Sequence, residues 1–178
     1  MNRSQRPSTA SGAAVQRPPL YTPEQRVRRD QSAWTLVQGI LAPVQFLVFL
    51  VSAALVLRYL ANGEGLMAAT VSVVVKTLVL YTIMVTGAIW EKVVFGQYLF
   101  APAFFWEDVF SFLVLALHTA YLLALFTGAL TPREQMLLAL AAYATYVINA
   151  AQFIWKLRLA RLDDAARRRA APLQGVAA

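Results

Sequence analysis

The sequence contains no cysteine and only one histidine, His118. The lack of cysteine excludes disulfides, thiolate catalysis and cysteine-ligated iron–sulfur clusters, and a single histidine excludes multi-histidine metal sites. Neither a glycine-rich nucleotide loop nor a Ser-His-Asp pattern is present. We therefore predict no bound metal and no cofactor, and any catalysis would depend on acid–base chemistry and positioning.

Charge is also scarce. Charged residues make up 14% of the chain and hydrophobic residues 59%, whereas soluble domains contain roughly 25% charged residues. Four apolar stretches are each long enough to cross a bilayer, which takes about 20 residues in a helix. They cover residues 31–57, 66–90, 109–130 and 135–155. The sequence therefore predicts an all-α membrane protein built as a bundle of four transmembrane helices.

The net charge of +7 comes mainly from basic residues that flank this apolar region. Basic residues close to the first and last stretches are Arg17, Arg26, Arg28, Arg29, Lys156, Arg158, Arg161, Arg167, Arg168 and Arg169. The first and third loops contain only Arg58 and Arg133, respectively. Because basic segments stay in the cytoplasm, we predict a multi-pass protein with both termini cytoplasmic. Its basic tails then contact anionic lipid rather than nucleic acid.

The two ends of the chain differ in composition from the middle. Residues 1–21 are rich in Ser, Ala, Pro and Arg and are predicted to be a disordered basic tail, and residues 159–178 a flexible basic tail. Thr22 can cap a helix that begins at Pro23, with Gln25 closing a capping box. We therefore expect the transmembrane domain to cover residues 22–158.

The connection between the second and third stretches, residues 90–108, is unusually aromatic. Aromatic residues favour the bilayer interface, and non-helical backbone at that depth must be buried in protein or line a cavity. We predict an aromatic interfacial loop on the cytoplasmic side, where Phe104, Phe105 and Trp106 would bind a large planar ligand by stacking. The alternative is an ordinary aromatic belt without a ligand.

Several polar residues lie within or beside the apolar stretches. An ionisable residue in a membrane span, such as His118, indicates a functional site. On a helix, Glu107 shares a face with His118, and Tyr121 lies at the edge of that face. Glu91 and Asp108 flank the aromatic connection, where a carboxyl group can act as a general acid or base. The alternative for these carboxyl groups is interfacial anchoring.

Lys76 and Asn149 also need an explanation. A charge at the centre of a span costs about 2.5–3.5 kcal/mol on insertion scales, so Lys76 must have a structural partner or bind an anionic group of a substrate. Asn149 belongs to a polar stripe with Gln152 and Lys156 at helical spacing. Such amides join helices by hydrogen bonds, or they line a polar cavity that admits water.

Six strings of residues resemble the vinyl bacteriochlorophyllide hydratase family of phototrophic bacteria, over about residues 20–160. The strings are LYTPEQR at 20–26, WTLVQG at 34–39, VTGAIWEK at 85–92, YLFAPAFFWED at 98–108, LHTAY at 117–121 and YVINAAQF at 146–153. The resemblance implies a lyase of bacteriochlorophyll biosynthesis in the bacterial inner or photosynthetic membrane. It would add water to the 3-vinyl group of chlorophyllide or bacteriochlorophyllide to give a 3-(1-hydroxyethyl) group, and other enzymes of the pathway are possible partners.

This chemistry suggests roles for the polar residues. We expect Glu107 to donate a proton, and Asp108 or Glu91 to position or deprotonate the water. His118 is either a ligand to the magnesium of the substrate or a base, and Lys76 or a terminal Arg would lie near the substrate's propionate. Tyr121 and Asn149 are further predicted substrate-binding residues. The alternatives to an enzyme are a pigment-binding or assembly protein in which His118 ligates magnesium, and a small transporter or scaffold that uses Lys76.

Overall fold

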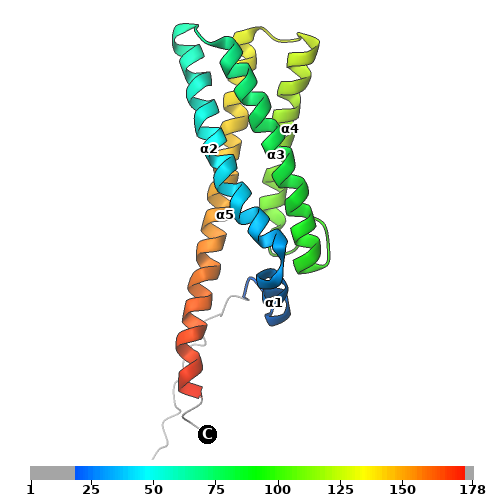
Figure 1. The fold of residues 1–178 in the computed structure, drawn as a ribbon, viewed down its shortest axis with the longest axis vertical. Helices are drawn as coiled ribbons and strands as arrows, with labels where there is room; N and C mark the ends of the chain where they lie inside the picture. The colour runs from blue at the N-terminus through cyan, green and yellow to red at the C-terminus, as the bar shows by residue number, and fades with distance from the viewer. Residues whose placement is uncertain (1–18, 175–178) are drawn as a thin grey trace, which may run out of the picture.

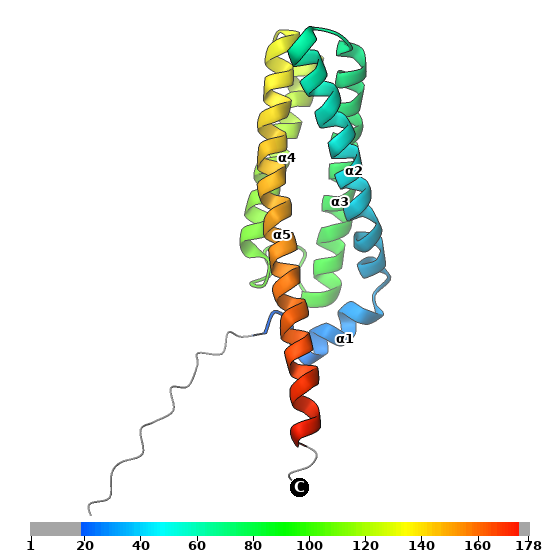
Figure 2. The ribbon, with the colours of Figure 1, turned by 90° about the vertical axis from the view of Figure 1, so that its left-hand side faces the viewer.

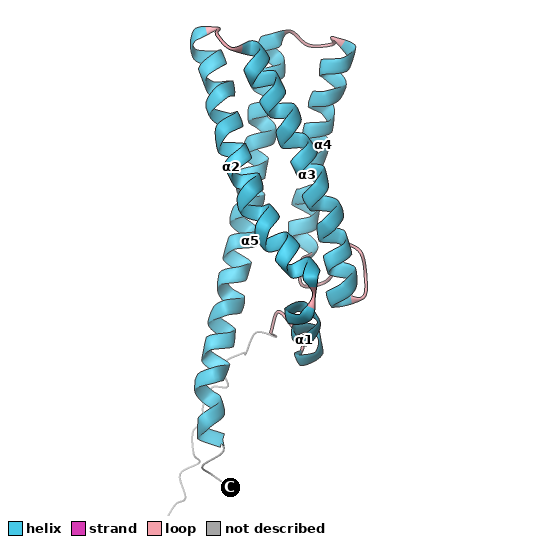
Figure 3. Ribbon diagram, viewed as in Figure 1, coloured by secondary structure: helices cyan, strands magenta, loops and turns pink. Residues whose placement is uncertain are grey.

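The computed structural model describes residues 19–174, and over that range the chain is helical with short connections (Figures 1 and 3). The helices are α1 (Pro23–Gln31), α2 (Ala33–Asn62), α3 (Leu66–Phe95), α4 (Phe105–Thr127) and α5 (Pro132–Gln174). The last four are long and apolar enough to span a membrane. The predicted all-α bundle of four membrane-spanning helices is thus confirmed. The predicted tails at residues 1–18 and 175–178 lie outside the described residues.

The four spans form two hairpins, α2 with α3 and α4 with α5, which pack closely within each pair and less closely between pairs. Gly63 and Gly65 turn the first hairpin with φ of 77° and 79°, a conformation that is strained for residues with a Cβ atom. In the second hairpin, the backbone N–H of Thr131 donates to Glu134 Oε2 at 2.8 Å. Short connections therefore set the antiparallel order of the spans.

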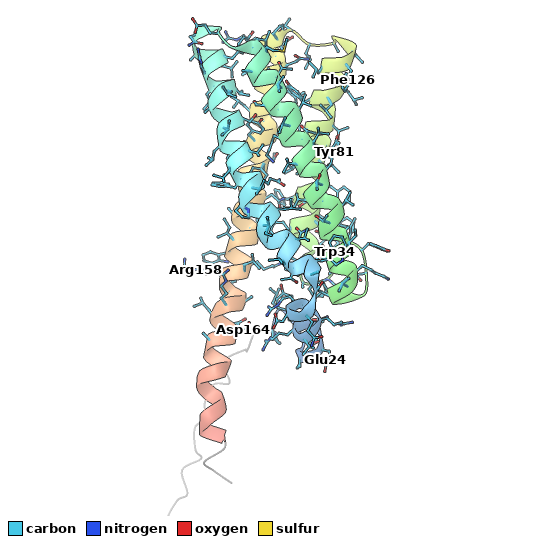
Figure 4. All side chains as sticks on the ribbon, in the orientation of Figure 1. Glu24, Trp34, Tyr81, Phe126, Arg158 and Asp164 are labelled. Carbon is cyan, nitrogen blue, oxygen red and sulfur yellow. The ribbon has the colours of Figure 1, made fainter. Side chains whose placement is uncertain are left out.

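The outside of the bundle is apolar, as a lipid-facing surface must be. Phe126 on the outer side of α4 is 79% exposed (Figure 4), and Leu47 and Leu123 are also exposed. Inside the bundle, the fully buried apolar residues include Val56, Val73, Val114, Met136 and Ala139. Buried polar side chains, among them Lys76 and His118, lie within this interior.

Helix α1 lies at the end of the bundle, beside α5 (Figure 2). Its predicted capping box is present, because Thr22 Oγ1 accepts from the Gln25 N–H at 3.2 Å and the Thr22 N–H donates to the Gln25 side chain at 2.9 Å. Ser32 ends α1 and caps α2. An ion pair of 2.8 Å between Arg26 and Asp164 joins α1 to α5.

Helix α5 differs from the prediction at its C-terminal end. It continues to Gln174 and extends beyond the bundle (Figure 1), past residue 158, where the transmembrane domain is predicted to end. The segment is rich in Ala, Leu and Arg, which are strong helix formers. The Arg26–Asp164 ion pair adds a tertiary contact to this extension.

Candidate functional site

The polar residues in the bundle form two groups. The carboxyl pair consists of Glu91 on α3 and Asp108 on α4, at the end of the bundle near α1. Asp108 Oδ2 accepts a hydrogen bond from the Phe100 N–H at 2.6 Å, and Glu91 Oε2 accepts one from the Ala101 N–H at 3.2 Å. Phe100 and Ala101 are adjacent in the sequence, so the two carboxyl groups that accept from them lie close together, and both are buried. Two carboxyl groups that are buried close together disfavour two negative charges, and this favours a state in which the pair holds one proton.

Phe100 holds the carboxyl pair through an unusual backbone conformation. Its φ of 59° is in the left-handed region, which costs a residue with a Cβ atom about 1–2 kcal/mol. Its ring stacks on Phe112 with centroids 5.5 Å apart, which favours this arrangement. Successive N–H groups that point the same way form a concave anion site. The sequence contains no signal that Phe100 adopts a left-handed backbone conformation, so this feature of the site was not predicted.

Glu107 has a different environment from the carboxyl pair. Its Oε2 lies 2.5 Å from Lys156 Nζ on α5, and the same ammonium group donates to the backbone carbonyl of Ala103. Glu107 is buried and Lys156 is mostly so. Lys156 was predicted to belong to the basic segment after the last span, although its position on the stripe with Asn149 and Gln152 is consistent with a side chain that faces the bundle.

The three aromatic residues predicted to stack on a planar ligand have different environments in the structure. Phe104 is buried, stacks on Phe153 at 5.9 Å and packs edge-on against Trp90 and Phe95. Phe105 and Trp106 are 44% and 66% exposed, with their rings perpendicular at a centroid distance of 5.5 Å. Phe104 is therefore a core residue, and Phe105 and Trp106 remain predicted binding residues that do not form one flat surface.

The second group lies near the middle of the bundle and contains Lys76, His118 and Tyr121, all fully buried. His118 Nδ1 is 2.8 Å from the Val114 carbonyl. Since a carbonyl only accepts, the proton is on Nδ1 and Nε2 is an acceptor. Lys76 Nζ lies 3.9 Å from the centre of the Tyr146 ring, a cation–π contact. Among residues 19–174, His118 Nε2, Lys76 Nζ and Tyr121 Oη have no hydrogen-bond partner.

Asn149 lies between the two groups. Its Nδ2 donates to Ser111 Oγ at 2.8 Å, which joins α5 to α4, so it does act as a bond between helices. Its Oδ1 is buried and has no partner within the described part of the chain. Over the same residues, no three His, Asp or Glu side chains come together as a metal site.

Four apolar spans, with two buried carboxyl groups at one end of the bundle, define a multi-pass membrane protein. The family model described as 2-vinyl bacteriochlorophyllide hydratase matches residues 21–159. The chain belongs to that family, which confirms the resemblance seen in the sequence. No solved structure matches it.

Two curated proteins named 2-vinyl bacteriochlorophyllide hydratase are similar to the chain. The protein of Cereibacter sphaeroides is 77% identical over 145 residues, which cover 81% of this chain and 89% of the relative. The protein of Rhodobacter capsulatus is 73% identical over 146 residues, which cover 82% of this chain and 85% of the relative. The matched region includes all the candidate site residues.

Proposed function

We propose that the protein is a hydratase of bacteriochlorophyll biosynthesis that adds water to the 3-vinyl group of chlorophyllide a or 3-vinyl bacteriochlorophyllide. The product carries a 3-(1-hydroxyethyl) group, and the enzyme acts as a hydro-lyase without a cofactor. Membership of the hydratase family supports the reaction. The observation that carries the mechanism is the buried carboxyl pair, Glu91 and Asp108.

The reaction requires a proton donor and a proton acceptor. Protonation of the terminal vinyl carbon forms a C–H bond and leaves a cation on the inner carbon, which is delocalised into the macrocycle. Water then attacks the inner carbon, a C–O bond forms, and the water loses a proton. Two carboxyl groups that share one proton can supply both steps, because one donates and the other accepts. The pair returns to its starting charge after each turnover.

The ion pair with Lys156 argues against Glu107 as the donor, which the sequence alone had favoured. Glu107 Oε2 lies 2.5 Å from Lys156 Nζ, and this charge-assisted hydrogen bond directs the carboxyl group toward α5 rather than toward a substrate. We therefore assign proton transfer to Glu91 and Asp108, and we assign to Glu107 the positioning of the start of α4. His118 is enclosed within the bundle beside Tyr143, which argues against a role as ligand to the magnesium of a macrocycle.

We place the macrocycle at the end of the bundle near α1, against the exposed rings of Phe105 and Trp106. Its propionate would pair with a basic residue near that end, because Lys76 is enclosed in the middle of the bundle. In the bacterial inner or photosynthetic membrane, with both termini cytoplasmic, the carboxyl pair would lie near the cytoplasmic surface. A charged pigment could then enter from that surface without crossing the membrane.

The test is to incubate the purified protein with chlorophyllide a and to analyse the pigment by mass spectrometry. We expect a product heavier by one water, formed in many turnovers per protein. The variant with both Glu91→Gln and Asp108→Asn should bind pigment and form almost no product. Stoichiometric retention of unchanged pigment by the native protein would contradict the proposal and favour a pigment-binding role.

A further inference from the structure

We propose that the bundle encloses a column of water molecules that runs from Tyr121 to the carboxyl pair and supplies the water consumed in the reaction. The column is a binding site for the second substrate, so its role in turnover rests on the proposed hydratase function. Its existence rests on a separate observation, the row of buried polar atoms without partners in the bundle interior.

Contacts between α4 and α5 define the levels of the column. These helices are antiparallel, and they meet at His118 with Tyr143, at Ser111 with Asn149, and at Glu107 with Lys156. Residues with lower numbers on α4 and residues with higher numbers on α5 therefore both lie nearer to α1. His118 lies farthest from the carboxyl pair among these residues, and Asn149 lies between.

Six buried side-chain atoms in this part of the described structure have no hydrogen-bond partner. They are Tyr121 Oη, His118 Nε2, Lys76 Nζ, Asn149 Oδ1, Gln45 Oε1 and Gln152 Oε1. All four spans contribute to this set, which therefore faces the common interior. Buried polar groups in proteins are almost always satisfied, by protein or by ordered water.

The order of these atoms follows from their neighbours. Lys76 contacts the Tyr146 ring, one turn of α5 before Asn149. Phe49 also packs on Tyr146, at 4.9 Å, and Gln45 lies one turn from Phe49 toward α1. From Tyr121 to Asp108, α4 extends about 20 Å at 1.5 Å per residue. A polar atom thus occurs at about every turn, close enough for bridging water.

The types of these atoms indicate water rather than an ion. An ammonium group, Lys76, only donates hydrogen bonds, whereas His118 Nε2 and the amide oxygen of Asn149 only accept. An anion would suit the donor but not the acceptors. A metal cation would suit the acceptors but would be repelled by the ammonium group of Lys76. A neutral molecule that both donates and accepts satisfies all of them.

The column is closed at its far end. Val56, Ala69 and Ala139 each lie about one turn farther from α1 than the hydrogen-bonded Ser52, Ser72 and Tyr143, at about the level of Tyr121. Met136 lies about one turn farther still, and all four residues are fully buried. This apolar layer separates the column from the other membrane surface, so water reaches the carboxyl pair without a path for protons across the bilayer. The arrangement fits a reservoir rather than a channel.

Hydroxyl-radical labelling in H₂¹⁸O tests the column directly, because radicals formed from bound water modify the adjacent side chains. We expect Tyr121, His118 and Tyr146 to be labelled in the native protein in lipid nanodiscs. Met136 is intrinsically more reactive and equally buried, but it lies in the apolar layer and should remain unlabelled. Labelling of Met136 as strong as that of Tyr121, or no labelling at Tyr121 and His118, would overturn the proposal.

Two variants connect the column to turnover. Asn149→Leu interrupts it and should cause loss of labelling at Tyr121 and His118, with a lower kcat and unchanged affinity for chlorophyllide. Ser111→Ala removes the same interhelical hydrogen bond but keeps the amide, so it should retain labelling and kcat. Gln45→Leu, on a different helix, should behave as Asn149→Leu does.

Labelling needs no pigment, so it separates the two hypotheses. A native protein that is labelled as expected but does not hydrate pigment would contradict the proposed function and leave the column in place. A hydratase with unchanged labelling and kcat in both Leu variants would overturn the column alone.

Discussion

Three buried carboxyl groups lie within a short distance at the end of the bundle, and their contacts distinguish them. Glu91 and Asp108 accept hydrogen bonds from backbone N–H groups of the same loop, whereas Glu107 faces an ammonium group. Residue type and position in the sequence are similar for Glu107 and Asp108. The difference arises from the neighbouring residues, Phe100 and Lys156, and it leads to different expected effects of substitution.

Replacing either member of the carboxyl pair by its amide should abolish proton exchange while preserving shape. In Glu91→Gln and Asp108→Asn, the amide oxygen can still accept from the Ala101 or Phe100 N–H. We expect kcat for hydration to fall by about 10²–10⁴-fold, the range for one general acid–base group, with the Kd for chlorophyllide unchanged. The control is Glu64→Gln, in the exposed turn between α2 and α3. Near-normal turnover in either amide variant would remove the pair from the mechanism.

The ion pair of Glu107 and Lys156 should behave as a coupled unit. Removing one partner of a buried pair costs about 3–5 kcal/mol because the other charge is left unpaired. Lys156→Met leaves the charge of Glu107 without a partner, and Glu107 is the more deeply buried of the two. This variant should therefore lower the thermal unfolding midpoint more than Glu107→Gln does. The double variant should regain part of the loss. Lys92→Met, at an exposed lysine, is the control, and strictly additive effects would contradict the coupling.

Among the elements, α1 is held against the bundle by contacts of unequal strength. Tyr21, just before the helix, is buried and stacks on Phe95 with ring centroids 5.8 Å apart. The Arg26–Asp164 ion pair is partly exposed, and such pairs contribute only about 0–1 kcal/mol. Removing a buried aromatic side chain costs about 3–5 kcal/mol. The aromatic contact should therefore dominate.

Limited trypsin digestion can compare the two contacts, because α1 contains Arg26, Arg28 and Arg29. Tyr21→Ala should be cleaved within α1 much faster than the native protein. Asp164→Asn should be cleaved at nearly the native rate. Tyr98→Ala, at an exposed aromatic residue in the connection between α3 and α4, serves as control. Equal sensitivity of the first two variants would show that the ion pair matters as much as the stacking.

The four spans could be predicted from the sequence because uninterrupted apolar length is a strong signal. The cap at Thr22 could also be predicted, since it depends only on neighbouring residues. The end of α3 was misjudged. The sequence placed the end of the second span at residue 90, but aromatic interfacial residues carry little information about where a helix stops, and α3 continues to Phe95.

The site was only partly predictable. Helical spacing correctly grouped Glu107 and His118 on one buried face of α4. It could not indicate which residues meet across helices, because the rotation of each helix is set by packing with its neighbours. The sequence therefore contained the polar residues but not their pairing. The contacts of Lys156 and the backbone conformation of Phe100 could not be predicted and are known only from the structure.

At the scale of the whole molecule, the two ends of the bundle differ in charge. The end with α1 and the extension of α5 carries most of the basic residues, whereas the far end has Arg58, paired with Glu64 at 3.2 Å, and Arg133. The positive-inside rule then predicts that the α1 end is cytoplasmic. The carboxyl pair lies at the same end, and the apolar layer around Met136 lies toward the other.

Reporter fusions test this orientation. A reporter at either terminus should be active only as a cytoplasmic reporter, and one inserted at residues 61–65 only as a periplasmic reporter. Termini on opposite sides would reject the count of four spans, and termini that are both periplasmic would reject the orientation. The orientation matters for chemistry, because a charged pigment that arrives from the cytoplasm could then reach the carboxyl pair directly. The reversed orientation would require that pigment to cross the bilayer before it reacts.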